Sequence, residues 1–183
     1  SPKIKRDRTP RPTHPVVQVT WDAAVEFVNR LNETQPPDRL EFALPTEAQW
    51  ESACRAGTTT YWHFGDNIAD LAEYGWHAGN SDGESHPVGS LKPNPFGLYD
   101  MHGNVWEWCA DWYAADYFEP QRMDDPTGPA QPTPTRDGVA RVLRGGNFSF
   151  AAQHSRSALR HAHPIADTHM TIGLRVAAEL KVD

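Results

Sequence analysis

The sequence predicts an α+β domain, and three features point to that class. Two amphipathic segments typical of helices come first, at 21–31 and within 46–57. Short apolar segments typical of strands follow at 105–108, 140–144 and 172–177. The 183 residues include 16 prolines and 13 glycines, which predicts many turns and irregular loops between short elements. A chain of this length suits one domain with a sizeable core.

The first two elements are predicted from the spacing of apolar residues. Val17 and Val19 share one face of an extended chain, which indicates a short strand at 16–19. Thr20 can then cap a helix that begins at Trp21, because the apolar residues that follow recur at spacing three and four. The apolar stripe of this helix consists of Ala24, Phe27, Val28 and Leu31.

The second helix has clearer ends. Thr46 and Gln49 have the spacing of a capping box, and Glu47 lies in the first turn. Gly57 marks the end of the helix, because glycine readily takes the left-handed conformation that follows a helix. The stretch 119–138 is rich in proline and shows neither helical nor strand periodicity, so we expect a surface loop there.

Composition and charge exclude several classes of function. The formal net charge is −7, and the basic residues near the start gather in a proline-rich arm, 1–13, ahead of a domain at 14–183. No basic face of the kind that binds nucleic acid is therefore expected. No apolar run approaches the roughly 18 residues of a membrane span. Cys54 and Cys109 are too few for a disulfide framework and lack metal-binding spacing, so we expect buried free thiols.

Five segments of the sequence together resemble a known family. In chain order they read LPTEAQWESACRAG, HPVGSLKPNPFGLYDMHGNVWEWCADWY, RVLRGGNF, RSALR and IGLRVA. These segments are similar to those of the formylglycine-generating enzyme (sulfatase-modifying factor) family, and the resemblance extends over about 14–180. It implies the family's variant of the C-type lectin fold, with two helices, twisted antiparallel sheets and much irregular loop.

The resemblance implies a structural calcium site in the tryptophan-rich segment. In the best-studied enzymes of the family a calcium ion is held around the GNVWEW block, and the matching positions here are Asp100, Gly103, Val105 and Glu107. Calcium takes several oxygen ligands, which two carboxylates and two backbone carbonyls would supply. The tryptophans would then pack around the ion. The alternative is that Asp100 and Glu107 cap turns and pair with arginines such as Arg144.

The resemblance also points to a chemistry that this chain lacks. Enzymes of the family oxidise a cysteine in a sulfatase to formylglycine, using copper bound by two active-site cysteines near the RSA-R segment. An alignment without gaps places Ala152 and Ser157 at those two positions. Cys54 and Cys109 lie in other segments and cannot substitute by position. Because a Cu(I) site needs thiolates, we expect no copper and no formylglycine formation.

The family also contains non-catalytic members without the cysteine pair, which this chain resembles. They include the variable proteins diversified by retroelements, which display a binding surface in the same C-terminal region. We therefore predict a ligand- or protein-binding module that recognises a protein, a glycan or another small molecule through 148–171. The candidate ligand-binding residues are Phe148, Phe150, His154, Leu159, His161, His163 and His169.

The histidines of this segment keep an enzyme as the alternative. His161 and His163 are two residues apart, so on a strand both would point to one side. With His154 or His169 they could complete a three-nitrogen metal site. Such a site would suit a metal-dependent oxidase of the formylglycine-generating or sulfoxide-synthase superfamily that acts on a cysteine or thiol substrate. The sulfoxide synthases take their iron-binding histidines from a helical bundle, and these 183 residues contain none.

Two N-terminal blocks of the family are not found in this sequence. Family members normally begin with a strand around a GxFxMGS-like block, followed by a block that introduces the first helix. Because the first and last strands of this fold commonly pair, we expect the strand at 172–177 to lack its neighbour. Three explanations remain open: the missing part is a separate chain, it was removed, or the fold is shortened. The first would make a second chain or segment the partner that completes the sheet.

Overall fold

The computed structural model describes residues 12–34, 40–117, 126–134 and 138–180. Most of the basic arm predicted at 1–13 lies outside these residues, as does part of the loop predicted at 119–138. The described part of that loop contains no helix, and no strand within 126–134. Among the described helices, none has the length and apolar character that crossing a bilayer requires.

Two α-helices, two short 3-10 helices and six strands are formed by the described residues. Their order is α1 (Trp21–Thr34), β1 (Leu40–Ala43), α2 (Glu47–Arg55), η1 (Ile68–Glu73), β2 (Trp106–Trp112), β3 (Ala140–Arg144), η2 (Ala152–Ser155), β4 (His161–Pro164), β5 (Ile172–Leu174) and β6 (Ala177–Leu180). This arrangement confirms the α+β class predicted from the sequence.

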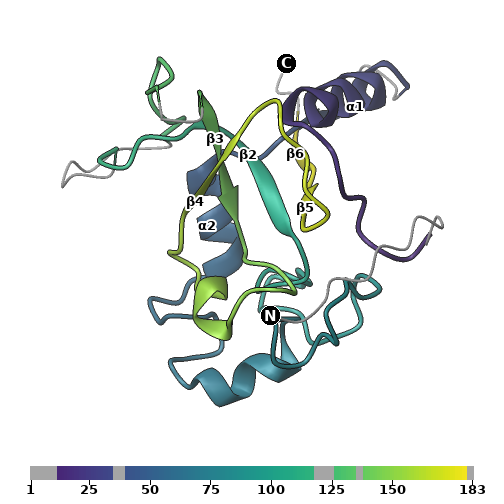
Figure 1. Cartoon of the computed structure of the whole chain (residues 1–183), viewed down its shortest axis with the longest axis vertical. Helices are drawn as coiled ribbons and strands as arrows, with labels where there is room; N and C mark the ends of the chain where they lie inside the picture. Colours follow the sequence, from purple (N-terminus) through teal and green to yellow (C-terminus); the bar gives the residue numbers. More distant parts are fainter. Residues whose placement is uncertain (1–11, 35–39, 118–125, 135–137, 181–183) are drawn as a thin grey trace.

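β2 lies inside a four-stranded sheet with the order β4-β3-β2-β5. β3 pairs antiparallel with both β2 and β4, whereas β5 runs parallel to β2, so this sheet is mixed. β1 and β6 form a separate antiparallel pair. α2 packs against β2 and β3, and α1 lies beside the β1–β6 pair, as Figure 1 shows.

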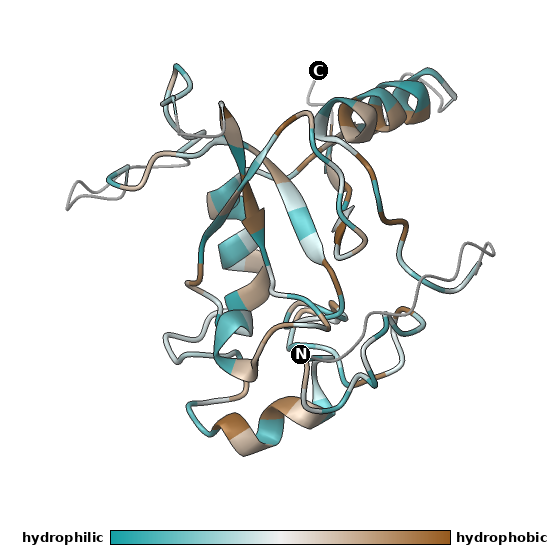
Figure 2. Ribbon diagram, viewed as in Figure 1, coloured by the Kyte–Doolittle hydropathy of each residue, from teal (hydrophilic) through white to brown (hydrophobic). Residues whose placement is uncertain are grey.

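The two faces of β2 contribute to two hydrophobic clusters, because successive residues of a strand point to opposite faces. Trp106 and Trp108 belong to the cluster that contains Val28 of α1. Cys109 belongs to the cluster that contains Trp50 of α2. Figure 2 shows hydrophobic residues in the middle of β3 and a largely hydrophilic α1. The sheet is therefore the common core element of the domain, and each α-helix covers a different part of it.

The capping box predicted for α2 is confirmed. Thr46 Oγ1 accepts a hydrogen bond from the Gln49 N–H at 3.1 Å, and Gln49 Oε1 accepts one from the Thr46 N–H at 3.0 Å. Asp111 of β2 adds a third contact, because its Oδ2 accepts from the N–H of Glu47 at 2.7 Å. At the other end Ala56, rather than Gly57, is the first residue in the left-handed region, with φ 47°.

The strand predicted at 16–19 is not formed. Gln18 takes the left-handed conformation with φ 62°, which interrupts the alternation that suggested a strand. The segment still lies against the sheet: the Gln18 N–H donates to His169 O at 3.2 Å, and the Val19 carbonyl accepts from Trp108 Nε1 at 3.1 Å. These hydrogen bonds to distant residues hold the segment against the sheet, although it does not pair with a neighbouring strand.

α1 begins at Trp21 as predicted and continues beyond Leu31 to Thr34. Ala24 and Val28 are buried on its inner side. Phe27, which the sequence placed in the same stripe, is 52% exposed, so the buried face is narrower than predicted. The tryptophan-rich β2 also extends further than predicted, whereas β3 has its predicted bounds.

The strand predicted at 172–177 is two strands. β5 ends at Leu174 and β6 begins at Ala177, and between them Arg175 pairs with Glu107 of β2. β5 pairs with β2 and β6 pairs with β1, so the expectation of a strand without a neighbour is wrong. Sequence periodicity did not predict β1 or β4, which have 4 residues each.

Candidate functional site

An aromatic patch lies on the predicted recognition segment, where the loop between β3 and β4 meets β2. It consists of Trp106, Phe150, His154 and His161. Phe150 is 37% exposed, and its ring meets the ring of His154 edge-on at 5.3 Å. His161 stacks on Trp106 with ring centroids 5.1 Å apart. The ring of Phe150 also meets the ring of His161 edge-on at 6.3 Å and the ring of Trp106 edge-on at 6.0 Å. The sequence assigned Trp106 to packing, and only the fold shows that it supports the patch.

The other predicted ligand-binding residues have different surroundings. Phe148 is 2% exposed, so it packs in the interior and does not contribute to an accessible surface. Leu159 packs against the hydrophobic cluster beside α1. His163 lies over Trp108 at 5.9 Å, and His169 shares a hydrogen bond of 2.7 Å with a neighbouring threonine hydroxyl. The remaining predicted residues are the ones that the fold brings together in the aromatic patch.

The histidines of this segment do not surround one point. His161 lies on Trp106, whereas His163 lies on Trp108, further along β2. Within the described part of the chain, no group of three or more His, Cys, Asp or Glu is arranged to hold a metal. The three-histidine metal site suggested by the sequence is therefore not formed there. Burial lowers the pKa of both His161 and His163, so both rings are uncharged at neutral pH.

The residues predicted at the family's two cysteine positions lie at the start of η2 and just after it. Ala152 begins this helix, and Ser157 follows it fully buried. Cys54 Sγ of α2 lies 3.6 Å from Ser157 Oγ. Sequence position predicted that Cys54 could not take the place of a missing cysteine, but the fold brings its thiol next to one of the two positions. Burial raises the pKa of Cys54 to about 12, so the thiol is protonated at neutral pH.

Two buried histidines adjoin this thiol. His102 Nδ1 lies 2.8 Å from Ser155 O, and His102 Nε2 lies 2.8 Å from His63 Nδ1. Because a carbonyl only accepts, His102 Nδ1 carries the proton and His102 Nε2 accepts from His63. Burial lowers the pKa of His63 to about 4 and that of His102 to about 3. The sequence singled out neither residue, because only the fold places His102 beside Cys54 and His63 beside His102.

This buried cluster has limited chemistry. It contains a protonated thiol, a hydroxyl and two neutral imidazoles, with Cys54 Sγ 3.8 Å from both ring nitrogens of His102. Copper(I) in this family requires a pair of thiolates, and the residues at the two positions supply none. Cys109, the other cysteine, is a buried free thiol in β2, as expected.

The residues predicted to bind calcium lie in the loop before β2 and in β2 itself. Glu107 accepts two hydrogen bonds from Arg175, at 2.7 Å and 2.8 Å, and one from Trp50 Nε1 at 2.7 Å. Asp100 Oδ2 accepts a backbone N–H at 2.8 Å, while its buried Oδ1 has no partner among the described residues. Burial raises the pKa of Asp100. The predicted pairing with an arginine is present for Glu107, but the partner is Arg175 instead of Arg144.

These features define the class of the protein. A twisted mixed sheet, two α-helices and long irregular loops make it a C-type-lectin-like domain of the formylglycine-generating-enzyme type. A family model described as "Sulfatase-modifying factor enzyme 1-like domain" matches residues 2–180. The chain belongs to this family.

Relatives of the chain include proteins with different names. It is 37% identical over 170 residues to a serine/threonine-protein kinase pkn1 of Chlamydia caviae, covering 92% of this chain and 24% of the kinase. It is 37% identical over 155 residues to the formylglycine-generating enzyme of Thermomonospora curvata, covering 76% of this chain and 46% of the enzyme. The chain thus spans less than half of either relative.

Solved structures share the same fold. Treponema denticola variable protein 1 matches with a TM-score of 0.80 and 29% identity, covering 97% of this chain and 74% of that one. PvdO from Pseudomonas aeruginosa matches with a TM-score of 0.80 and 27% identity, covering 97% of this chain and 66% of that one. The scaffold is therefore similar in a variable protein and in other members of the family.

Proposed function

We propose that this domain is a ligand- or protein-binding module on a formylglycine-generating-enzyme-type scaffold, with its recognition surface in 148–171. The observation that carries the proposal is the aromatic patch, in which Phe150 is exposed between the rings of His154 and His161. The likeness to a protein named as a variable protein supports a display function, in the manner of the retroelement variable proteins.

The chemistry of the aromatic patch favours certain ligand groups. His161 is uncharged at neutral pH because burial lowers its pKa, so it presents a flat and largely apolar surface together with Phe150. An aromatic or apolar side chain of a protein, or the apolar face of a sugar ring, can stack on such a surface. The His161 ring stacks on the buried ring of Trp106. Rigid aromatic groups of this kind commonly contribute much of the energy of an interface.

Peptide selection tests the aromatic patch directly. Random peptides displayed on phage would be selected on the wild-type domain after depletion on a Phe150→Ala variant. We expect clones that bind the wild type at least about tenfold more tightly than the variant, because loss of a central aromatic contact costs about 2 kcal/mol.

The matched control is Phe96→Ala, which removes a phenylalanine that is 63% exposed in a different loop. Selected clones should bind this variant as well as they bind the wild type. Clones that lose affinity for both variants equally, or for neither, would contradict the proposed recognition surface.

The alternative function is a metal-dependent oxidase that acts on a cysteine or thiol substrate. The observation in its favour is the thiol of Cys54 beside Ser157. This single thiol is protonated at neutral pH, because burial raises its pKa to about 12. A soft copper site needs thiolates, so the binding module agrees better with the residues present.

We propose, in addition, that calcium binds at Asp100, Gly103, Val105 and Glu107 and stabilises the domain. Two observations support this site. Asp100 Oδ1 is a buried oxygen without a partner among the described residues. Arg175 lies near both carboxylates, so one guanidinium faces two negative groups and one negative charge remains to be balanced. Backbone carbonyls of Gly103 and Val105 would complete an oxygen ligand set of the kind that calcium takes.

Calcium removal is expected to lower the melting temperature of the domain. A ligand at about 100 times its Kd stabilises by about 2.7 kcal/mol, which corresponds to roughly 5–10 °C for a domain of this size. Scanning calorimetry with EDTA and with excess calcium measures this difference. Asp100→Asn should abolish the response, whereas Asp116→Asn in an exposed turn should retain it. Equal melting temperatures of the wild type in EDTA and calcium would refute the site.

A further inference from the structure

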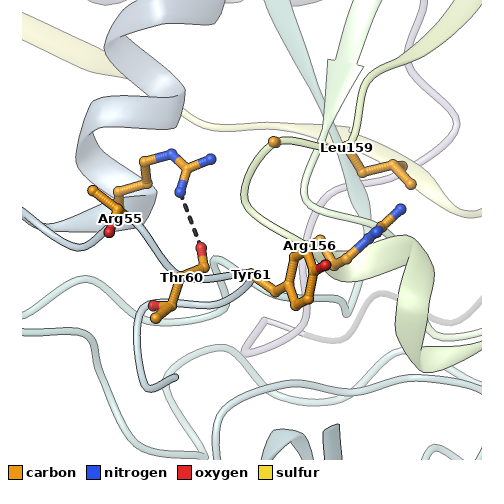
Figure 3. Close-up of a pocket in the computed structure, with 7 residues that line it drawn as sticks. Arg55, Thr60, Tyr61, Arg156 and Leu159 are labelled. Atoms are coloured by element: carbon orange, nitrogen blue, oxygen red, sulfur yellow. Dashed lines mark hydrogen bonds between the residues drawn. The ribbon is translucent and has the colours of Figure 1, made fainter. Parts of the chain in front are cut away.

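A pocket of about 280 Å³ lies between the end of α2 and the loop before β4. Arg55, Thr60 and Tyr61 form one wall, and Arg156 and Leu159 form the other (Figure 3). The two walls come from segments far apart in the sequence, so the pocket exists only in the folded domain. It adjoins the recognition segment 148–171, because one of its walls belongs to that segment.

Both arginines of the pocket have unused hydrogen-bond donors. Arg55 donates from NH1 to Thr60 O at 3.0 Å and from Nε to Glu51 at 2.7 Å. Arg156 donates from Nε to Gln153 O at 3.1 Å, and its terminal nitrogens have no partner among the described residues. The Arg156 guanidinium lies 5.6 Å from the centre of the Tyr61 ring. A guanidinium with free N–H groups is a strong donor for carboxylate oxygens.

Carboxylates pair with several arginines around the pocket. Arg55, Arg144 and Arg160 share two carboxylates, because Glu51 pairs with the first two and Glu47 with the last two.

Arg156 adds a positive charge without a carboxylate partner in the described part of the chain. Asp66 offsets part of the Arg156 charge, since its carboxylate accepts the Tyr61 N–H at 2.7 Å nearby. An arginine without a carboxylate partner stands out in a chain with a formal net charge of −7.

The guanidiniums of Arg55 and Arg156 lie on different walls of the pocket. Figure 3 shows Arg55 on one side of Thr60 and Tyr61 and Arg156 on the other. An extended segment with neighbouring acidic side chains could pair with both guanidiniums. The ring of Tyr61 and the side chain of Leu159 offer apolar contact for the stems of such side chains.

We propose that this pocket binds acidic side chains of a peptide segment, with Arg55 and Arg156 pairing with separate carboxylates. The inference rests on the proposed binding function and names the chemistry of one part of its partner. The aromatic patch would contact an apolar group of the same partner, and the pocket would contact its acidic part. Recognition by charge would weaken as ionic strength rises, since salt screens exposed charges.

Binding of an acetylated and amidated tetraglutamate peptide tests the pocket. Isothermal titration at low ionic strength should show binding of this peptide to the wild-type domain, and much weaker binding of tetraglutamine or inorganic phosphate. Arg156→Gln should lower the affinity for tetraglutamate at least about tenfold. Arg30→Gln, a matched control on the exposed side of α1, should change it less than about twofold. Circular dichroism confirms that each variant is folded.

Three results would overturn the proposal: no binding of tetraglutamate, equal binding of tetraglutamine, or equal loss of affinity in Arg156→Gln and Arg30→Gln. The Phe150→Ala variant separates this inference from the proposed function. It should bind tetraglutamate like the wild type, because Phe150 does not line the pocket. Tetraglutamate binding together with a failed peptide selection would support the arginine-lined pocket and rule out the aromatic patch. The opposite pair of results would leave the aromatic patch and remove the pocket.

Discussion

Replacing Arg144 by methionine should destabilise the domain by about 3–5 kcal/mol, the cost of removing one partner from a buried ion pair. Arg144 is fully buried, and its guanidinium donates to Glu51 and to the carbonyls of Ser157, at 2.7 Å, and Leu159, at 2.6 Å. The variant leaves these carbonyls without their donor, and each unsatisfied buried acceptor costs about 1–3 kcal/mol. Urea denaturation followed by tryptophan fluorescence measures the loss.

The same variant connects stability to the proposed pocket. Because Arg144 holds the backbone at Ser157 and Leu159, its loss should also weaken tetraglutamate binding at the neighbouring Arg156. Arg30→Met is the control, since the Arg30 side chain is 72% exposed and its ion pair with Glu26 is solvated. An exposed pair contributes about 0–1 kcal/mol. A loss of less than about 1 kcal/mol in Arg144→Met would contradict the role assigned to this residue.

Gly103→Ala should destabilise the domain by about 4 kcal/mol or more, which is exceptional for one methyl group. Gly103 has φ +117°, and a Cβ there would lie 2.1 Å from the carbonyl oxygen of Trp76. That oxygen also accepts a hydrogen bond from the Asn104 N–H at 2.9 Å, so the two chain segments cannot separate without losing it. The loop concerned contains the proposed calcium ligands, and the variant should lose the calcium response as well.

Gly97→Ala separates the two causes of the loss expected for Gly103→Ala, which are left-handed backbone strain and the close approach of Trp76. Gly97 has φ +79° in the same region of the chain, but a Cβ there would meet nothing within 4 Å. Its substitution should cost only the left-handed backbone strain of about 1–2 kcal/mol. Chemical denaturation of both variants gives the comparison. Similar losses in the two variants would mean that the close approach of Trp76 does not constrain Gly103.

Local sequence predicted the elements whose determinants lie within a few residues. The start of α2 was predicted because Thr46 and Gln49 form both halves of the capping box themselves. The bounds of β3 were predicted because its apolar residues are followed directly by two glycines. α1 was predicted from Trp21 onward, but its exposed Phe27 shows that spacing alone does not fix the width of a buried face.

Residues far apart in sequence decided the elements that were missed. Gln18 adopts a left-handed conformation and hydrogen-bonds His169, so no strand forms at 16–19. Arg175 pairs with Glu107 and separates β5 from β6. β1 is short and forms by pairing with β6, a partner near the other end of the chain. None of these contacts leaves a periodic pattern in the local sequence.

The residues of the candidate sites were also predicted where they lie in one segment and missed where they come from distant segments. Phe150, His154 and His161 were predicted because they lie close together in one segment, but Trp106, which stacks on His161, comes from a distant strand. The pocket of Arg55 and Arg156 and the contact of Cys54 with Ser157 were not predicted. Both depend on the docking of α2 against the loop before β4.

The sequence by itself determined the fold class, the capped second helix and the family, and it predicted Ala152 and Ser157 at the family's two cysteine positions. These follow from residue identity and short-range spacing, which the chain carries before it folds. Only the tertiary structure decided that Phe148 is buried, that the histidines rest on separate tryptophans, and that Arg175 neutralises Glu107. Burial and charge pairing depend on which segments pack together, and that packing is a property of the whole domain.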